Sequence, residues 1–179
     1  NNIGDDCIYM SNLTRSKDVC FQGKVQYFGG SLIMMRPKKG SSFNMEKIIN
    51  YEIACLQTRS KMVSLEDKQR DIDIRDNISR IGEMTDYITA FGNSDVKLIV
   101  LPEYSINARW EKMDLQNWLK ISTTIPGPYT DLLADKAKER KIWIAANMLE
   151  IHPDFPGRFF NTSFLLNPEG EIILKHWKN

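Results

Sequence analysis

The stretch Val96-Lys97-Leu98-Ile99-Val100-Leu101-Pro102-Glu103-Tyr104 decides the fold that this sequence predicts. Its consecutive apolar residues 98–101 are typical of a strand covered on both faces, as strands of parallel sheets are. Pro102 lacks a backbone N–H, so regular strand pairing should stop there. Site residues of α/β proteins gather beyond the carboxyl ends of the strands, which makes Glu103 a candidate. The alternative is that Glu103 is simply a solvated carboxylate at the end of a strand.

The residues before this stretch predict a strand and a long helix. Ile53-Ala54-Cys55-Leu56 is a short apolar run closed by polar residues 57–60, as expected for a first core strand. Apolar side chains then recur every three or four positions, which predicts a helix over residues 71–91 with one buried stripe. The stripe comprises Ile74, Ile78, Ile81, Met84, Ile88 and Phe91. Strand, helix and strand form a βαβ unit, so we expect the two strands to be parallel.

The same alternation of helix and strand follows the central stretch. Residues 104–120 predict a loop and a short helix whose aromatic side chains could line a pocket or anchor the helix to the core. Residues 124–128 predict a turn, and residues 129–141 predict a second amphipathic helix. Residues 142–150 then form another apolar run, which predicts a second buried strand ending in a carboxylate.

The last part of the chain predicts a hairpin. Residues 162–167 and 171–178 are strand-like, and the turn Asn167-Pro168-Glu169-Gly170 separates them. The second arm carries two lysines three positions apart, Lys175 and Lys178. The sequence therefore predicts an α/β fold that ends in an antiparallel pair of strands.

Composition places the chain among single globular domains. Of its 179 residues, 42% are hydrophobic and 26% are charged, which is enough for one core but short for two. The net charge of +1 provides no field that would attract nucleic acid or a membrane surface, so a small molecule or a protein is the expected partner. No apolar segment is long enough to span a membrane and no secretory signal is evident, so we expect a cytoplasmic protein.

The cysteines and histidines predict neither a disulfide framework nor a metal site. Cys7, Cys20 and Cys55 are odd in number and lack the spacing of metal ligands. His152 and His176 are the only histidines, and they are not spaced as a metal pair.

Residues 1–45 differ from the rest of the chain because they show little sustained periodicity. We expect an amino-terminal extension of unknown role there, with a short strand or hairpin within residues 26–35. The predicted domain comprises residues 46–179.

Four blocks of this sequence resemble motifs of the nitrilase or carbon-nitrogen hydrolase superfamily, most of all its aliphatic amidase and formamidase branch. They occur in the family's order and at similar spacing. They are residues 98–105 (Leu-Ile-Val-Leu-Pro-Glu-Tyr-Ser), 124–127 (Thr-Ile-Pro-Gly), 160–162 (Phe-Asn-Thr) and 167–178 (from Asn167-Pro168-Glu169-Gly170 to Lys175-His176-Trp177-Lys178). The resemblance implies a four-layer α-β-β-α sandwich, of which this chain would be the amino-terminal half.

The resemblance also implies a catalytic site. In that family a glutamate, a lysine and a cysteine act together, and the thiolate attacks a carbonyl or nitrile carbon to form a thioester or thioimidate. Glu103 matches the glutamate. Lys178 matches the lysine, because the family's Lys-Tyr-Arg-Lys corresponds to Lys175-His176-Trp177-Lys178. This chain departs from the pattern at His176 and Trp177, where the family usually has Tyr and Arg.

These residue types suit the cleavage of an amide. A thiol becomes a good nucleophile when a base accepts its proton, and shelter from water can raise the pKa of a glutamate toward that task, so Glu103 would be the base. Lys178 would stabilise the negative charge of the tetrahedral intermediate. The substrate pocket would include Tyr104, Trp110 and Glu150, and Glu150 would orient Lys178 or the substrate. Alternatively, Glu150 pairs with a basic side chain, and the two aromatic residues serve only in packing.

The family's cysteine follows the lysine by some tens of residues, so Cys7, Cys20 and Cys55 do not occupy its position. The resemblance therefore implies that the nucleophile lies beyond residue 179 and that these residues alone should not turn over substrate. It also implies a small amide or nitrile substrate, no cofactor, and association into a homo-oligomer.

Two other functions are compatible with the sequence. A metal-dependent phosphoesterase also uses a four-layer sandwich with a glutamate at a strand end, there as a magnesium ligand, although no Asp-His constellation occurs here. A non-catalytic or split family member, retained for assembly, would keep the sheet and leave the site idle.

Overall fold

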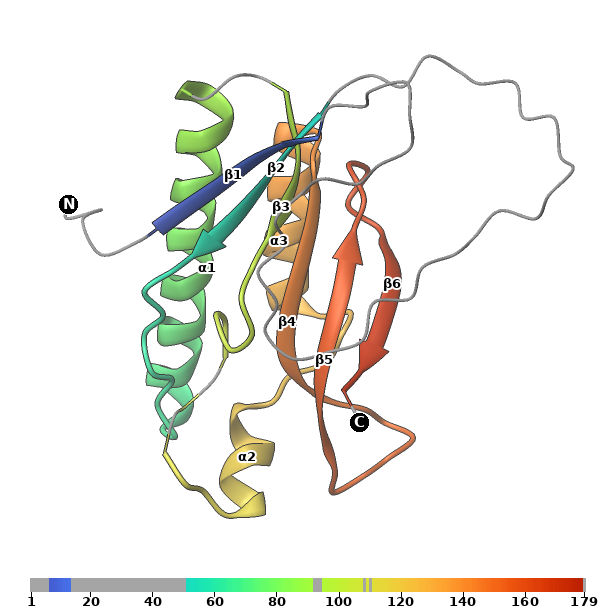
Figure 1. Ribbon diagram of the computed structural model, residues 1–179. Helices are drawn as coiled ribbons and strands as arrows, with labels where there is room; N and C mark the ends of the chain where they lie inside the picture. The colour runs from blue at the N-terminus through green and yellow to red at the C-terminus, as the bar shows by residue number, and fades with distance from the viewer. Residues whose placement is uncertain (1–6, 14–50, 92–94, 108, 110, 179) are drawn as a thin grey trace, which may run out of the picture.

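The computed structural model describes residues 7–13, 51–91, 95–107, 109 and 111–178 (Figure 1). These residues form one sheet of six strands, in which the strands follow one another in chain order, together with three helices. The elements are β1 (Cys7–Leu13), β2 (Tyr51–Gln57), α1 (Asp67–Phe91), β3 (Val96–Val100), α2 (Leu115–Ile121), α3 (Pro128–Arg140), β4 (Trp143–Ile151), β5 (Phe159–Leu166) and β6 (Ile172–Trp177).

The sheet is parallel in its centre and antiparallel at both sides. β2, β3 and β4 run parallel, β1 pairs antiparallel with β2, and β5 pairs antiparallel with both β4 and β6. α1 connects β2 to β3, and α3 precedes β4; both helices lie on the same face of the sheet (Figure 1). The predicted α/β class, the parallel βαβ unit and the hairpin are therefore confirmed.

The core lies between the sheet and these two helices. Ala54, Ile99, Ile144 and Leu166 are paired in register across four neighbouring strands, and each is fully buried. The predicted stripe of α1 faces this layer, and its described side chains are nearly inaccessible: Ile74, Ile78, Ile81, Met84 and Ile88. The side chain of Phe91 lies outside the described part. Burying one such side chain contributes roughly 1.5–3 kcal/mol, so this layer holds the helices on the sheet.

The opposite face of the sheet carries apolar side chains that are only partly covered. We call the following residues the open face: Ile53, Cys55, Leu98, Val100, Trp143, Ala145, Leu165 and Leu174. Cys55 is exposed, and Leu174 is 54% exposed. Neither α1 nor α3 packs against this face (Figure 1). The described residues thus supply one sheet and one helical layer of the predicted sandwich.

Local chemistry explains where the elements begin and end. α1 begins one turn earlier than predicted because the Glu66 carboxylate accepts the backbone N–H groups of Lys68 and Gln69, at 3.2 and 2.9 Å. Beyond β3, the N–H of Leu101 still donates to the carbonyl of Ala145 at 2.9 Å, and then Pro102 has no N–H to offer. The strand therefore ends just before Glu103.

The turn between β5 and β6 depends on an asparagine and a glycine. Asn167 Oδ1 accepts the backbone N–H groups of Glu169 and Glu171, at 3.1 and 2.7 Å. Gly170 has φ +78°, and a Cβ atom there would lie 2.3 Å from Lys138 Cε. The Lys138 side chain can move, but the positive φ strains any other residue, and the added Cβ would also lie 3.1 Å from the Ala134 carbonyl, which favours glycine here.

β1 lies within the segment that was predicted to be an extension. It adds an edge strand to the sheet, and its Tyr9 is paired with Cys55 of β2. The sequence pattern predicts no strand there, although Ile8-Tyr9 in an apolar run is a signal that could have indicated one. The strand or hairpin predicted within residues 26–35 lies outside the described residues.

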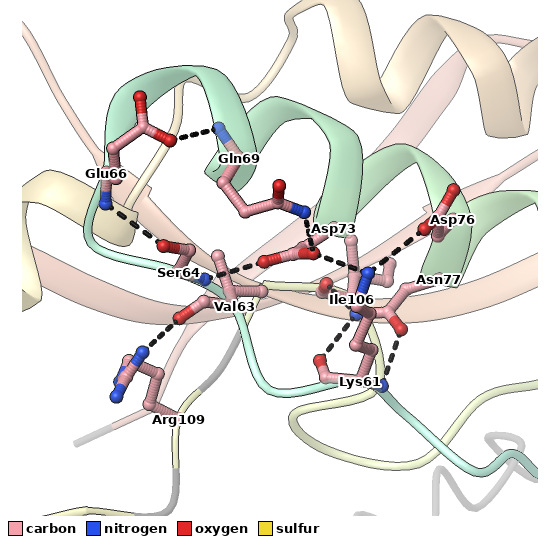
Figure 2. Close-up of polar contacts among 10 residues, drawn as sticks. All are labelled: Lys61, Val63, Ser64, Glu66, Gln69, Asp73, Asp76, Asn77, Ile106 and Arg109. Atoms are coloured by element: carbon pink, nitrogen blue, oxygen red, sulfur yellow. Dashed lines mark hydrogen bonds and ion pairs between the residues drawn. The ribbon is translucent and has the colours of Figure 1, made fainter.

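A polar cluster at the start of α1 fixes the connection from β2 (Figure 2). The Asp73 side chain is only 3% exposed and accepts Ser64 N and Gln69 Nε2, each at 2.9 Å, and Lys61 Nζ at 2.7 Å. Burial raises the pKa of Asp73, but the hydrogen bonds from Lys61, Gln69 and Ser64 lower it further than burial raises it. The carboxylate is therefore held in its ionised form in the folded protein.

Two buried asparagines tie this connection to the loop that follows β3. Asn77 Nδ2 donates to the carbonyls of Lys61 and Ile106, both at 2.9 Å (Figure 2). Asn107 donates to the carbonyl of Leu149 at 2.9 Å and accepts its N–H at 2.8 Å. The loop after β3 is thereby fixed on α1 and β4, which limits where Glu103 can lie.

Replacing Asp73 by Asn should lower the free energy of unfolding by about 2 kcal/mol, because the donors on Lys61, Ser64 and Gln69 lose a charged acceptor whose side chain is only 3% exposed. Asp76, which is 56% exposed and also contacts Lys61, offers a matched control, and Asp76→Asn should change stability by about 0.5 kcal/mol or less. Urea unfolding of both variants at pH 7 measures the difference. Equal losses in the two variants would contradict the assignment.

Stability should also depend on pH through Asp73. Its pKa is lower in the folded state, so its contribution is fully present above the unfolded-state pKa of about 3.9 and is lost as pH falls through the folded-state value. Urea unfolding between pH 5 and pH 2 should therefore show a smaller gap between wild type and Asp73→Asn at the acidic end.

Candidate active site

Glu103 and Lys178 are brought together although they are 75 residues apart. Lys178 Nζ donates to Glu103 Oε1 at 2.8 Å, and the two side chains are 61% and 40% exposed. Glu103 lies in the loop after β3, and Lys178 comes directly after β6. The carboxylate and the ammonium that the sequence predicts to act together thus share one hydrogen bond at an edge of the sheet.

Two asparagines connect this pair to the sheet. Asn161 Nδ2 donates to Glu103 Oε1 at 2.5 Å and to the Tyr104 hydroxyl at 3.3 Å. Asn147 Nδ2 in turn donates to Asn161 Oδ1 at 2.6 Å, and Asn147 Oδ1 accepts the Tyr104 N–H at 3.3 Å. The carbonyl of Asn161 accepts the N–H of Lys178 at 2.8 Å. The amides of β4 and β5 therefore orient both members of the pair.

Asn147 and Asn161 are not among the site residues that the sequence predicts. The available signal was an amide within a strand that is otherwise apolar, as Asn147 is in residues 142–149. A polar side chain at such a position requires hydrogen-bond partners, and partners inside a sheet often belong to a site.

Tyr104 has a backbone conformation that is rare for a bulky residue. Its φ is +64°, in the left-handed region, which costs about 1–3 kcal/mol for a non-glycine residue. The hydrogen bond to Asn147 and the packing of its ring against the core hold this conformation. Such strained residues cluster at functional sites, and this one directly follows Glu103.

The electrostatics of the pair favour two charged groups. The hydrogen bond from Lys178 lowers the pKa of Glu103; partial burial raises it, and the hydrogen bonds of Asn161 and Tyr104 lower it further, so the net change is downward. The same contact raises the pKa of Lys178. The sequence-based expectation was a raised pKa for a sheltered Glu103. The direction is opposite here because Glu103 is paired and remains 40% exposed.

Glu150 lies in a different environment. It is fully buried, and its carboxylate accepts Lys175 Nζ at 2.6 Å, Thr162 Oγ1 at 2.7 Å and Trp177 Nε1 at 2.8 Å. We refer to Glu150, Thr162, Lys175 and Trp177 as the Glu150 anchor. The structure thus places Glu150 with a basic side chain, Lys175, as the alternative interpretation of the sequence had it, and not beside Lys178.

The Glu150 anchor and the Glu103–Lys178 pair lie on opposite faces of the sheet. Successive side chains of a strand alternate between faces. Asn161 contacts Glu103 whereas its neighbour Thr162 contacts Glu150. Likewise, Trp177 contacts Glu150 and the following residue, Lys178, contacts Glu103.

The other predicted pocket residues have different outcomes. Tyr104 lies in the site, where its hydroxyl accepts the Asn161 amide. Trp110 lies outside the described residues. Trp118 stacks on Phe159 with ring centroids 5.4 Å apart, so it anchors α2 to β5.

Two features of the described residues bear on other classes of protein. Among them, no group of three or more His, Cys, Asp or Glu side chains is placed to hold a metal ion. In the same part of the chain, no helix has both the length and the apolar character needed to cross a membrane.

The fold and the site define an α/β protein with a carboxylate-ammonium pair where its central strands end. The sequence profile of the carbon-nitrogen hydrolase family matches residues 52–179. The chain belongs to the carbon-nitrogen hydrolase family.

Curated relatives agree with this membership. Formamidase of Bacillus cereus (strain B4264) is 31% identical over 152 residues, which cover 84% of this chain and 40% of the formamidase. Formamidase of Bacillus thuringiensis (strain Al Hakam) is 30% identical with the same coverage. The chain therefore spans about two fifths of the length of these relatives.

Solved structures show the same fold. The crystal structure of N-terminal amidase with a Gln-Gly peptide superposes with a TM-score of 0.57 at 14% identity, over 71% of this chain and 27% of that chain. At this level of identity, the similarity concerns the fold alone.

Replacing Lys178 by Met should raise the pKa of Glu103 toward its ordinary value, because the largest cause of the downward shift is removed. Asn161→Ala should raise it less. Carboxyl-detected NMR titration measures both changes. Asp86 is an internal control whose pKa should not change, because it is lowered by Lys136 and Arg140, which are not part of this site. An unchanged Glu103 titration in Lys178→Met would show that the pair does not form in solution.

Proposed function

We propose that this chain forms the amino-terminal half of a hydrolase that cleaves the C–N bond of a small aliphatic amide to give an acid and ammonia. The observation that carries the proposal is the 2.8 Å contact between Glu103 and Lys178, at positions that match the family's catalytic glutamate and lysine. The membership of residues 52–179 in the carbon-nitrogen hydrolase family and the similarity to formamidases support it. The nucleophilic cysteine would lie outside these residues.

In this proposal, Glu103 and Lys178 have complementary tasks. Glu103 accepts the proton of the cysteine thiol, and the thiolate attacks the amide carbonyl. The Lys178 ammonium donates a hydrogen bond to the carbonyl oxygen as it becomes an oxyanion. Protonated Glu103 then gives its proton to the departing ammonia, and it later accepts a proton from the water that hydrolyses the thioester.

The position of the pair at the edge of the open face has a consequence for this chemistry. In this structure Glu103 is partly solvated and its pKa is lowered, which makes it a weak base. A second sheet packed on the open face would exclude water, and desolvation disfavours the carboxylate and increases its basicity. We infer that the site becomes competent only when that layer covers it.

Three further predictions come from the sequence. A metal-dependent phosphoesterase and a non-catalytic or split family member are the competing functions. Self-association through a helical layer is also still a prediction, and on α1 the side chains of Ile72 and Tyr87 are 41% and 52% exposed.

In a form of the protein long enough to include the cysteine, Glu103→Gln and Lys178→Met should each reduce kcat/KM for ammonia release from formamide or acetamide by about 10²–10⁴-fold, a size typical of lost acid-base or oxyanion groups. Asp76→Asn, on the outer surface of α1, should leave activity within about twofold. Wild-type turnover in Glu103→Gln would rule out the proposed role of this residue.

Residues 1–179 alone should release no ammonia above the buffer rate, because they hold no thiol at the family position. The same assay at equal protein concentration measures this. Turnover by these residues, abolished by Cys55→Ser, would assign the nucleophile to Cys55 instead.

A further inference from the structure

We propose that Glu150 is a positioning residue, which sets Lys178 against Glu103 by anchoring strand β6 from the opposite face of the sheet. The proposal rests on the proposed function, in which the Glu103–Lys178 pair does the chemistry. It goes further because it assigns a task to the Glu150 anchor, which touches neither member of the pair.

The Glu150 carboxylate is fully buried. Glu150 is 0% exposed, and a carboxylate without water must have charged or hydrogen-bonding partners. Of its three donors, two are β6 side chains, Lys175 and Trp177. Because the Glu150 carboxylate needs both donors, it fixes the position of β6 at Lys175 and Trp177.

Trp177 is packed among three aromatic rings. Its ring stacks on Phe160 with centroids 4.3 Å apart and an angle of 18° between the planes. His152 and Phe155 meet it edge-on, at 5.4 and 5.5 Å. With its indole N–H on Glu150 as well, Trp177 is held in one orientation, and alternation along the strand then directs Lys178 to the other face.

The end of β6 lies at the edge of the described sheet. In the described sheet β6 pairs only with β5, and its residues 173–176 are exposed. The last backbone contact is the hydrogen bond from Lys178 N to the Asn161 carbonyl, at 2.8 Å. Beside the backbone pairing with β5, which reaches Trp177, the Glu150 anchor is the side-chain restraint next to Lys178.

This assignment also explains the departure from the family pattern. The resemblance places Arg where this chain has Trp177, and both side chains combine a flat face with an N–H donor. Trp177 keeps the donor for Glu150 without adding a second cation beside Lys175.

The reactivity of individual lysines tests the proposal without any catalytic readout. Residues 1–179 are treated with limiting acetic anhydride at pH 9, and acetylation of each lysine is measured by mass spectrometry. Glu150→Gln should increase the rate at Lys178 by about two- to fivefold, the effect of freeing an amine from an exposed ion pair. Lys136, held by Asp86 and Glu139 between α1 and α3, should keep its rate.

A double-mutant cycle separates positioning from general loosening. Glu103→Gln should by itself increase the Lys178 rate, because it removes the partner of the amine. If Glu150 acts through the pair, Glu150→Gln should add nothing in the Glu103→Gln background. Equal increases in both backgrounds would overturn the proposal, as would an unchanged Lys178 rate in Glu150→Gln.

If Glu150→Gln increases the acetylation rates of Lys178 and Lys136 alike, the fold itself has loosened. The variant Trp177→Phe then tests whether Glu150 positions Lys178. This variant keeps the ring stack and removes only the N–H donated to Glu150. A selective increase at Lys178 supports positioning, and no increase overturns it. Because amide hydrolysis is not measured, these results stand whether or not the proposed function is correct.

Discussion

A carboxylate buried in the sheet must be paired, and in this protein that constraint determines how the last strand runs. Glu150 has no access to solvent and is satisfied by Lys175, Thr162 and Trp177. Two of these donors belong to β6, so a shift of that strand by one residue would turn Lys175 and Trp177 to the other face and leave the buried carboxylate with Thr162 alone. The register of β6, and with it the position of Lys178, follows from this pairing.

The sheet acts as a partition between two polar groups of different character. On the face that carries the helices, the carboxylate of the Glu150 anchor is inaccessible to solvent. On the other face, Glu103 and Lys178 remain accessible at the edge of an apolar surface, held by the amides of Asn147 and Asn161. Adjacent residues serve the two groups because side chains alternate along a strand, so a short segment of β5 and β6 contributes to both.

The strain and the electrostatics of the site have a common origin. Pro102 ends the pairing of β3, and Tyr104 turns the chain with φ +64°, so that Glu103 meets the end of β6. The resulting ion pair lowers the pKa of Glu103, which favours the ionised carboxylate at a site that is still partly exposed to solvent. A base for a thiol requires a drier environment, and the open face is where further protein would have to supply it.

The sequence by itself determined the α/β class, the order of the central elements, the apolar stripe of α1 and the identity of Glu103 and Lys178 as candidates. These follow from periodicity and motifs, which are local properties of the chain. Only the tertiary structure decided that Asn147 and Asn161 orient the pair, that Glu150 binds Lys175 rather than Lys178, and that β1 extends the sheet. Those facts depend on strand register and on which face each side chain takes, and both are set by contacts between segments far apart in the chain.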